Sequence, residues 1–119
     1  MAIAVVVYGA GGKMGSEVLN ALCRDPELEA VAAVDSRAQD SSLSLPDGSG
    51  QIPYSRQLEP VLSQCRPDVL VDFTVRDSTL AAVPVAAQCG VNLVIGTSGL
   101  SHEDITEIER LCTSGDVGA

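Results

Sequence analysis

Short apolar runs rich in β-branched residues alternate along this chain with longer segments whose apolar residues recur at helical spacing. The apolar runs that have the length of strands are Ile3–Tyr8, Leu28–Val34, residues 69–73 and Asn92–Ile95. Strands that alternate with helices form βαβ units, in which successive strands lie parallel. The pattern therefore predicts an α/β fold with a doubly wound parallel sheet.

Helical spacing is clearest after the first of these strands. Apolar side chains recur there at positions i, i+4, i+7 and i+8, namely Met14, Val18, Ala21 and Leu22. Residues with this spacing share one face of a helix. We therefore expect a helix from the region of Met14 to Arg24, directly after the strand.

Two further helices are expected in the middle of the chain. One covers residues 58–65, and the other begins at Asp77 or Ser78 as its N-cap and runs to Gly90. Pro84 lies inside the second pattern and lacks the N–H that a helix interior needs. We expect Pro84 to kink this helix, or else the helix to be shorter than the segment that runs to Gly90.

The remaining segments are a loop, a capped helix and the last residues of the chain. Residues 38–53 are rich in Ser, Asp, Gly and Pro and are expected to form a loop. Ser101, with Asp104 three residues later, resembles a capping box at the start of a final helix. Residues 117–119 resemble the beginning of another strand, so we expect the chain to be a fragment of a larger protein.

Composition narrows the classes of function. The 119 residues carry 16 acidic and 7 basic side chains, a formal net charge of −9, and so offer no basic patch for a nucleic acid. The longest apolar run is far shorter than the roughly 20 residues of a membrane span. We expect one domain, no nucleic acid or membrane partner, and a cytoplasmic protein.

The four cysteines predict no metal site. Cys23, Cys65, Cys89 and Cys112 lie far apart, form no C-x-x-C pair and have no histidine cluster beside them. Each falls near the end of an expected helix. We interpret them as small buried hydrophobic residues in a reducing cytosol rather than as redox groups.

A glycine-rich turn follows the first strand, with the sequence Gly9-Ala10-Gly11-Gly12-Lys13-Met14-Gly15. Glycines let backbone N–H groups approach a pyrophosphate at the positive end of the following helix. The spacing departs from the usual G-x-G-x-x-G, because Met14 takes the place of the third glycine. Strand, turn and helix together predict a Rossmann-type site for NAD or NADP, with residues 9–14 at the cofactor.

Asp35 ends the second strand, at the position where an acid accepts hydrogen bonds from the adenosine ribose. A carboxylate there favours NADH, since it would repel a 2′-phosphate. Arg37, like Lys13, is able to neutralise such a phosphate, although an exposed loop arginine is an equally good interpretation. Ser36, Asp35 and Arg37 are therefore candidate cofactor residues, and the choice between NADH and NADPH stays open.

Two more groups of residues follow later strands. They are Asp72-Phe73-Thr74 and Gly96-Thr97-Ser98-Gly99. Ligands of open α/β sheets bind at the carboxyl ends of strands, although each group alone is also an ordinary strand-to-helix loop. His102, the only histidine, is expected on the surface rather than in catalysis.

Together, the glycine turn, Asp72-Phe73-Thr74 and Gly96-Thr97-Ser98-Gly99 resemble the amino-terminal domain of the dihydrodipicolinate reductase family over essentially the whole chain. The resemblance implies an oxidoreductase of the diaminopimelate route to lysine, commonly a homotetramer, that passes a hydride from NADH or NADPH to 4-hydroxy-tetrahydrodipicolinate. It implies pyrophosphate at the glycine turn and ribose at Asp35. Phe73, Gly96, Thr97 and Ser98 would line the nicotinamide side.

The same resemblance also points to departures. NADPH-using members often carry a basic residue directly after the acid, where this chain has Ser36. The family's substrate site uses a histidine pair and a lysine in a second domain, whereas this chain has one histidine and one lysine, Lys13. We therefore assign no catalytic residue and interpret residues 1–119 as the dinucleotide-binding domain of a two-domain protein, inactive alone.

Other functions fit the same fold. The chain is also compatible with the nucleotide domain of another NAD(P)-dependent dehydrogenase, of the homoserine or aspartate dehydrogenase type. A non-enzymatic dinucleotide- or CoA-binding module is a further alternative, because fold does not fix function. Asp35 disfavours CoA, whose 3′-phosphorylated adenosine gains nothing from a carboxylate beside its ribose.

Overall fold

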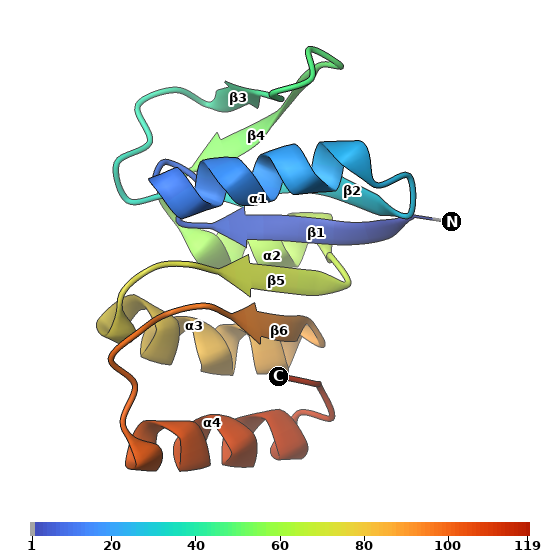
Figure 1. The fold of residues 1–119 in the computed structure, drawn as a ribbon. Coiled ribbons are helices and arrows are strands. Elements are labelled where there is room, and N and C mark those ends of the chain that lie inside the picture. Colours follow the sequence, from blue (N-terminus) through green and yellow to red (C-terminus); the bar gives the residue numbers. More distant parts are fainter. Residues whose placement is uncertain (1) are drawn as a thin grey trace.

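The computed structural model describes residues 2–119 and shows, within them, a six-stranded sheet flanked by four helices (Figure 1). The strands are β1 (Ile3–Tyr8), β2 (Leu28–Val34), β3 (Ser42–Ser44), β4 (Gln51–Ser55), β5 (Val69–Asp72) and β6 (Asn92–Ile95). The helices are α1 (Lys13–Arg24), α2 (Leu58–Cys65), α3 (Arg76–Cys89) and α4 (His102–Ser114).

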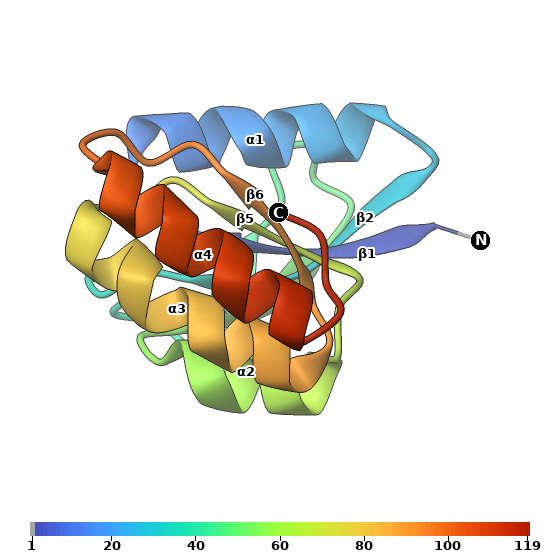
Figure 2. The ribbon, with the colours of Figure 1, turned by 90° about the horizontal axis from the view of Figure 1, so that it is seen from below.

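The sheet is doubly wound around a central β1. Its strand order is β3-β4-β2-β1-β5-β6, and all neighbouring strands run parallel except β3, which is antiparallel to β4. Figure 2 shows α1 on one side of the sheet and α2, α3 and α4 on the other. The prediction of a Rossmann-type α/β fold is confirmed.

Both faces of β1 are buried, which explains its uninterrupted apolar sequence. Val5 and Val7 pack with Leu19 and Leu22 of α1, and Val6 points into the core under the other helices. Burial of one such side chain contributes about 1.5–3 kcal/mol. The carboxyl end of β1, from which the glycine turn starts, is therefore held rigidly.

The prediction of a loop over residues 38–53 was wrong, because this segment contains β3 and most of β4. Ile52 and Tyr54 pack against the α1-side core, whereas Gln51 and Pro53 are exposed. This is strand alternation with a period of two. The surrounding Ser, Gly and Pro residues hid it from the sequence pattern.

The predicted start of α3 was also wrong. Its N-cap is Val75, with no side-chain cap, rather than Asp77 or Ser78. The helix continues through Pro84 to an αL C-cap at Gly90, so the alternative of a shorter helix does not hold. The extended backbone of Val75 lets the chain turn into a helix close after β5 ends, which places the first turn of α3 at the edge of the sheet.

The other helix ends follow the sequence more closely. α1 ends at Arg24 as predicted, and α4 begins with the predicted capping box of Ser101 and Asp104. After α4, the chain returns beside β6, where the Leu93 N–H donates to the Gly118 carbonyl at 2.9 Å. The last residues make this one sheet-like contact without forming a strand.

Within residues 2–119, no helix has the length and apolarity needed to cross a bilayer. The same residues contain no group of three or more histidine, cysteine or acidic side chains arranged to hold a metal ion. Cys112 is buried, as expected, but the other three cysteines are only half-buried. Burial raises the pKa of the Cys112 thiol.

Candidate functional site

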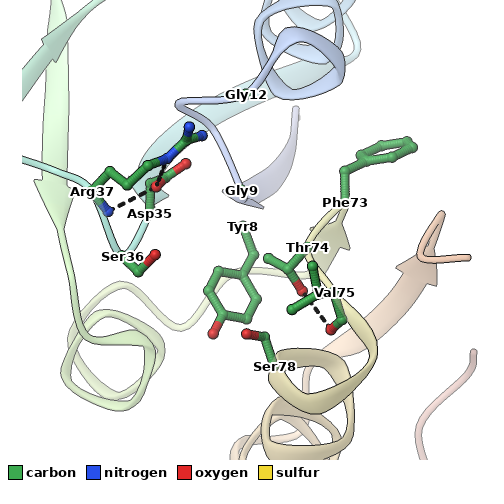
Figure 3. Close-up of a pocket in the computed structure, with 10 residues that line it drawn as sticks. All are labelled: Tyr8, Gly9, Gly12, Asp35, Ser36, Arg37, Phe73, Thr74, Val75 and Ser78. Atoms are coloured by element: carbon green, nitrogen blue, oxygen red, sulfur yellow. Dashed lines mark hydrogen bonds and ion pairs between the residues drawn. The ribbon is translucent and has the colours of Figure 1, made fainter. Parts of the chain in front are cut away.

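A hollow of about 250 Å³ lies at the carboxyl ends of β1, β2 and β5 (Figure 3). From β1 the chain passes to α1 on one side of the sheet, and from β5 to α3 on the other, so this is a topological switch point where α/β folds bind ligands. The residues that line the hollow are Tyr8, Gly9, Gly12, Asp35, Ser36, Arg37, Phe73, Thr74, Val75 and Ser78.

Gly9 and Gly15 are required by the fold of the turn itself. Gly9 has a positive φ of 90°, and a Cβ built there would lie 3.0 Å from the Phe73 carbonyl oxygen. A Cβ on Gly15 would overlap the Gly9 carbonyl oxygen. These two glycines therefore let the first turn of α1 pack closely against the end of β1.

Gly12 is different, because nothing in the protein requires a glycine there. Its φ is −86°, and the nearest atom to a built Cβ, the Gly9 carbonyl oxygen, is at an ordinary 3.5 Å. Gly12 is also the N-cap of α1, which has no side-chain cap and no acidic residue in its first turn. The space at Gly12 and the uncapped positive end of α1 together suit an anion such as a phosphate group.

Asp35 connects the glycine turn to the end of β2. One of its carboxylate oxygens, Oδ2, accepts the Gly11 N–H at 2.7 Å, and the other accepts the Arg37 backbone N–H at 2.9 Å and Nε at 3.3 Å. Burial opposes ionisation of this carboxyl, but these N–H groups and the guanidinium outweigh it and lower its pKa. Asp35 is therefore an ionised, preorganised acceptor.

Arg37 lies between the carboxylate and the helix end. Its guanidinium is largely exposed and pairs with Asp35, and its Nη2 lies 3.8 Å from a Cβ built on Gly12. A ligand hydroxyl that reaches Asp35 must share the carboxylate with this guanidinium. The cation is equally close to any phosphate bound at Gly12.

Phe73 and Gly96 join the ends of β5 and β6. A Cβ on Gly96 would overlap the Phe73 ring, so the ring lies directly against the Gly96 backbone. In Figure 3 the ring points away from Tyr8 and the rest of the hollow. Phe73 therefore separates the hollow from the loop that follows β6.

A partly buried network of threonine hydroxyls surrounds the buried Asp72. The Asp72 Oδ1 accepts the Thr74 N–H at 2.8 Å and the Thr74 hydroxyl at 2.6 Å. The Thr97 hydroxyl lies 2.7 Å from the Thr79 hydroxyl and 3.5 Å from Asp72 Oδ1. Thr97 thus uses its hydroxyl inside the protein and fixes the loop, while Asp72 Oδ2 is buried without a partner among the described residues.

The structure brings only part of the predicted set together. One hollow is lined by six of the predicted residues, namely Gly9, Gly12, Asp35, Ser36, Arg37 and Phe73. Gly11 is linked to it because its N–H donates a hydrogen bond to Asp35. The others do not line the hollow. Ala10 has its side chain in the core, and Lys13 and Met14 are exposed on α1. Gly96 lies against the Phe73 ring, and Thr97 and Ser98 follow it in the loop after β6.

Four lining residues were absent from the predicted cofactor-binding set: Tyr8, Thr74, Val75 and Ser78. Of these, Thr74 belongs to the Asp72-Phe73-Thr74 group recognised in the sequence. Two of them adjoin predicted residues, since Tyr8 directly precedes Gly9 and Thr74 follows Phe73. That adjacency was the available signal. His102 is exposed at the start of α4, as expected.

Comparison with known proteins identifies close relatives of this chain. Residues 3–119 match the sequence model of the family described as dihydrodipicolinate reductase, N-terminus. A 4-hydroxy-tetrahydrodipicolinate reductase of Dehalococcoides mccartyi is 56% identical over 116 residues, which cover 98% of this chain and 44% of the relative. The chain therefore spans less than half the length of this curated relative.

Solved structures show the same fold. A dipicolinate-bound dihydrodipicolinate reductase from Paenisporosarcina sp. TG-14 superposes with a TM-score of 0.79 at 28% identity, over 97% of this chain and 44% of that one. A homoserine dehydrogenase of S. aureus gives a TM-score of 0.80 at 13% identity, over 98% of this chain and 31% of that one. At that low identity, the second match shows the fold alone.

Proposed function

The chain belongs to the family of dihydrodipicolinate reductase amino-terminal domains, and from this premise we propose that it is the cofactor-binding part of a 4-hydroxy-tetrahydrodipicolinate reductase. In this proposal the complete enzyme reduces 4-hydroxy-tetrahydrodipicolinate with NADH or NADPH, in the diaminopimelate route to lysine. The observation that carries it is the uncapped N-terminus of α1 at Gly12, with the ionised Asp35 beside it.

The residues present fit a nicotinamide dinucleotide. The open space at Gly12 and the first-turn N–H groups of α1 would hold the pyrophosphate, and Asp35 would accept the ribose hydroxyls. Phe73 and the Gly96 to Ser98 loop would form the nicotinamide side. The cofactor supplies the hydride, while the protein binds it, orients it and keeps water away.

We propose that both NADH and NADPH are accepted. Asp35 suits the free ribose of NADH, and the Arg37 guanidinium, held at Asp35 by one contact of 3.3 Å, is free to turn towards a 2′-phosphate. Because Arg37 is largely exposed, this movement breaks little packing. The carboxylate offers a partner to the ribose of NADH, and the cation beside it offers one to the 2′-phosphate of NADPH.

The substrate site belongs, in this proposal, to a second domain of the complete protein. The chain spans 44% of its Dehalococcoides relative, and we assign no catalytic residue to residues 1–119. We further propose that the complete protein is a cytoplasmic homotetramer, as the resemblance to the family implies.

The test is an assay of the complete protein that carries this chain. The protein should reduce freshly generated 4-hydroxy-tetrahydrodipicolinate with NADH and with NADPH. The loss of absorbance of the reduced nicotinamide measures the reaction. Aspartate semialdehyde, a homoserine dehydrogenase substrate, serves as the comparison. Turnover of the semialdehyde alone would favour the homoserine dehydrogenase alternative and overturn the proposal.

A further inference from the structure

Three hydroxyl groups from separate segments line the hollow beside Asp35. They belong to Tyr8 at the end of β1, Ser36 after β2, and Ser78 in the first turn of α3. Figure 3 shows the Tyr8 ring between the two serines, with its hydroxyl directed away from Gly9. All three residues line the hollow, and among the described residues none of their hydroxyls is a buried polar atom without a partner, so the hollow presents them to a ligand.

The ring of Tyr8 is fixed in place by the sheet. Tyr8 pairs with Val34 of β2 and Asp72 of β5, and its ring packs against the core on the α3 side. Tyr54, the other tyrosine, belongs to the core on the α1 side. The Tyr8 hydroxyl therefore has a defined position, unlike that of a surface side chain.

The proposed cofactor positions determine what reaches this hydroxyl. With the pyrophosphate at Gly12 and the ribose at Asp35, the base attached to that ribose enters the same hollow. A volume of about 250 Å³ falls below the roughly 300–1,000 Å³ of pockets that enclose a complete ligand. The hollow thus holds one end of a dinucleotide, not all of it.

The chemistry of the walls matches a flat base with a polar edge. Val75 lines the hollow with a side chain that is 67% exposed, an apolar surface that a base face would cover. The three hydroxyls are each both donor and acceptor. They can therefore pair with an edge that carries a donor beside an acceptor, such as the 6-amino group and N1 of adenine.

We propose that Tyr8 is a specificity-determining residue, whose hydroxyl, with those of Ser36 and Ser78, binds the 6-amino and N1 edge of the cofactor's adenine. The proposal deepens the proposed function and rests on it. The alternative ligand for these hydroxyls is the 2′-phosphate of NADPH. Adenine is favoured because Tyr8 and Ser78 lie on the α3 side of the hollow, whereas Arg37, the cation suited to a phosphate, lies at Asp35.

The experiment measures the affinity of the complete protein for NADH, NADPH and 1,N6-etheno-NADH, in which an added ring blocks the adenine edge. Tyr8→Phe removes only the hydroxyl. Tyr54→Phe is the matched control, because it removes a tyrosine hydroxyl beside Gly11 and Asp35, at the ribose end of the proposed site and not at its base end. Loss of one hydrogen bond should weaken NADH and NADPH by about fivefold each in Tyr8→Phe. The affinity for the etheno analogue, which is already weak in the wild type, should change less than twofold in Tyr8→Phe. Tyr54→Phe should keep the wild-type ratio of the affinity for NADH to that for the etheno analogue.

Three results would overturn the inference. If Tyr8→Phe loses the same factor of affinity for NADH and for the etheno analogue, Tyr8 acts through the fold. If it loses affinity for NADPH alone, the hydroxyl binds the 2′-phosphate. An unchanged affinity for NADH would remove Tyr8 from the site. If the wild type binds none of the three dinucleotides, it is the proposed function that fails.

Discussion

Gly12 and Gly15 stand three residues apart in one turn, yet they are glycine for different reasons. A Cβ on Gly15 would overlap the Gly9 carbonyl oxygen, whereas a Cβ on Gly12 meets nothing closer than 3.5 Å. The fold therefore requires glycine at position 15, whereas the open space at Gly12 is what our proposal assigns to the pyrophosphate. Sequence alone assigns both to one motif, because the contacts that separate them appear only when the chain is folded.

The first prediction follows from this difference. Gly12→Val should leave the domain folded and nearly abolish dinucleotide binding, because the branched side chain fills the space where the backbone meets the pyrophosphate. Gly15→Ala should instead destabilise the fold. Calorimetric titration with NADH and thermal unfolding by circular dichroism measure the two effects. A folded Gly12→Val protein with wild-type affinity would remove the turn from the site.

Asp35 carries the second prediction. Asp35→Ala should weaken NADH more than NADPH, because only the unphosphorylated ribose gives both hydroxyls to the carboxylate. Loss of such charge-assisted hydrogen bonds costs about 1.5–3 kcal/mol. Since Asp35 also accepts the Gly11 N–H, some loss for both cofactors is expected, and the measured quantity is the ratio of the two affinities.

The control for that experiment is Arg37→Ala, which should weaken NADPH more than NADH. If the two variants change the ratio of NADH to NADPH affinity in opposite directions, the carboxylate selects for NADH and the guanidinium selects for NADPH. If Asp35→Ala weakens both cofactors equally, the carboxylate acts only on the glycine turn and does not select at the ribose.

At the scale of elements, the first turns of α3 and α4 are joined by an ion pair between the half-exposed Arg76 and the buried Asp104. Arg76 donates to Asp104 from Nε at 2.7 Å and from Nη2 at 2.8 Å, and Asp104 also accepts the Ser101 N–H at 2.9 Å. The Arg76 guanidinium and the Ser101 N–H hold the pKa of Asp104 well below its usual range. The pair thereby fixes the loop between β6 and α4.

The third prediction concerns the pH dependence of this pair. A carboxyl with a lowered folded-state pKa stabilises the fold above its unfolded value of about 3.9, and this stabilisation is lost as the pH falls below that value. The Tm of Arg76→Gln should therefore lie below that of the wild type at neutral pH, and the gap should narrow below about pH 4. Thermal unfolding at a series of pH values measures it.

Arg110→Gln is the matched control, since Arg110 pairs with Glu107 on the exposed face of α4. Exposed pairs of this kind contribute roughly 0–1 kcal/mol, so its Tm should stay close to that of the wild type at every pH. A gap for Arg76→Gln that stays constant down to strongly acidic pH would show that Asp104 ionisation is not the cause.

Elements with a strong apolar periodicity were predicted well from the sequence. Elements that form because one strand pairs with another were predicted poorly. β1 and α1 were recognisable from their apolar pattern, but β4 exists because Ile52 and Tyr54 pack beside β2. The face to which Tyr8 points was equally hidden, because both faces of β1 are buried. Side-chain pairs that are distant in sequence, such as Arg76 with Asp104, need the folded arrangement to be seen.

At the scale of the whole molecule, the candidate cofactor residues gather at the carboxyl edge of the sheet, and our proposal assigns the substrate to a second domain. We propose that the hollow, the uncapped N-terminus of α1 and the Phe73–Gly96 contact together hold the cofactor. The one histidine, His102, is exposed at the start of α4. We therefore expect the chain alone to bind the cofactor without catalysing the reaction.

The last prediction is that the 119-residue chain binds NADH or NADPH but does not reduce 4-hydroxy-tetrahydrodipicolinate. In our proposal the residues that orient the dicarboxylate against the nicotinamide belong to a second domain, and such positioning can supply about 7–11 kcal/mol of the barrier. Affinity should survive because Gly12, Asp35 and Arg37 lie within the chain. Titration with NADH and an absorbance assay with freshly generated substrate, each run beside the complete protein, measure both properties. Turnover near the rate of the complete protein would contradict a second-domain substrate site and direct attention to His102 and Lys13 as catalytic groups.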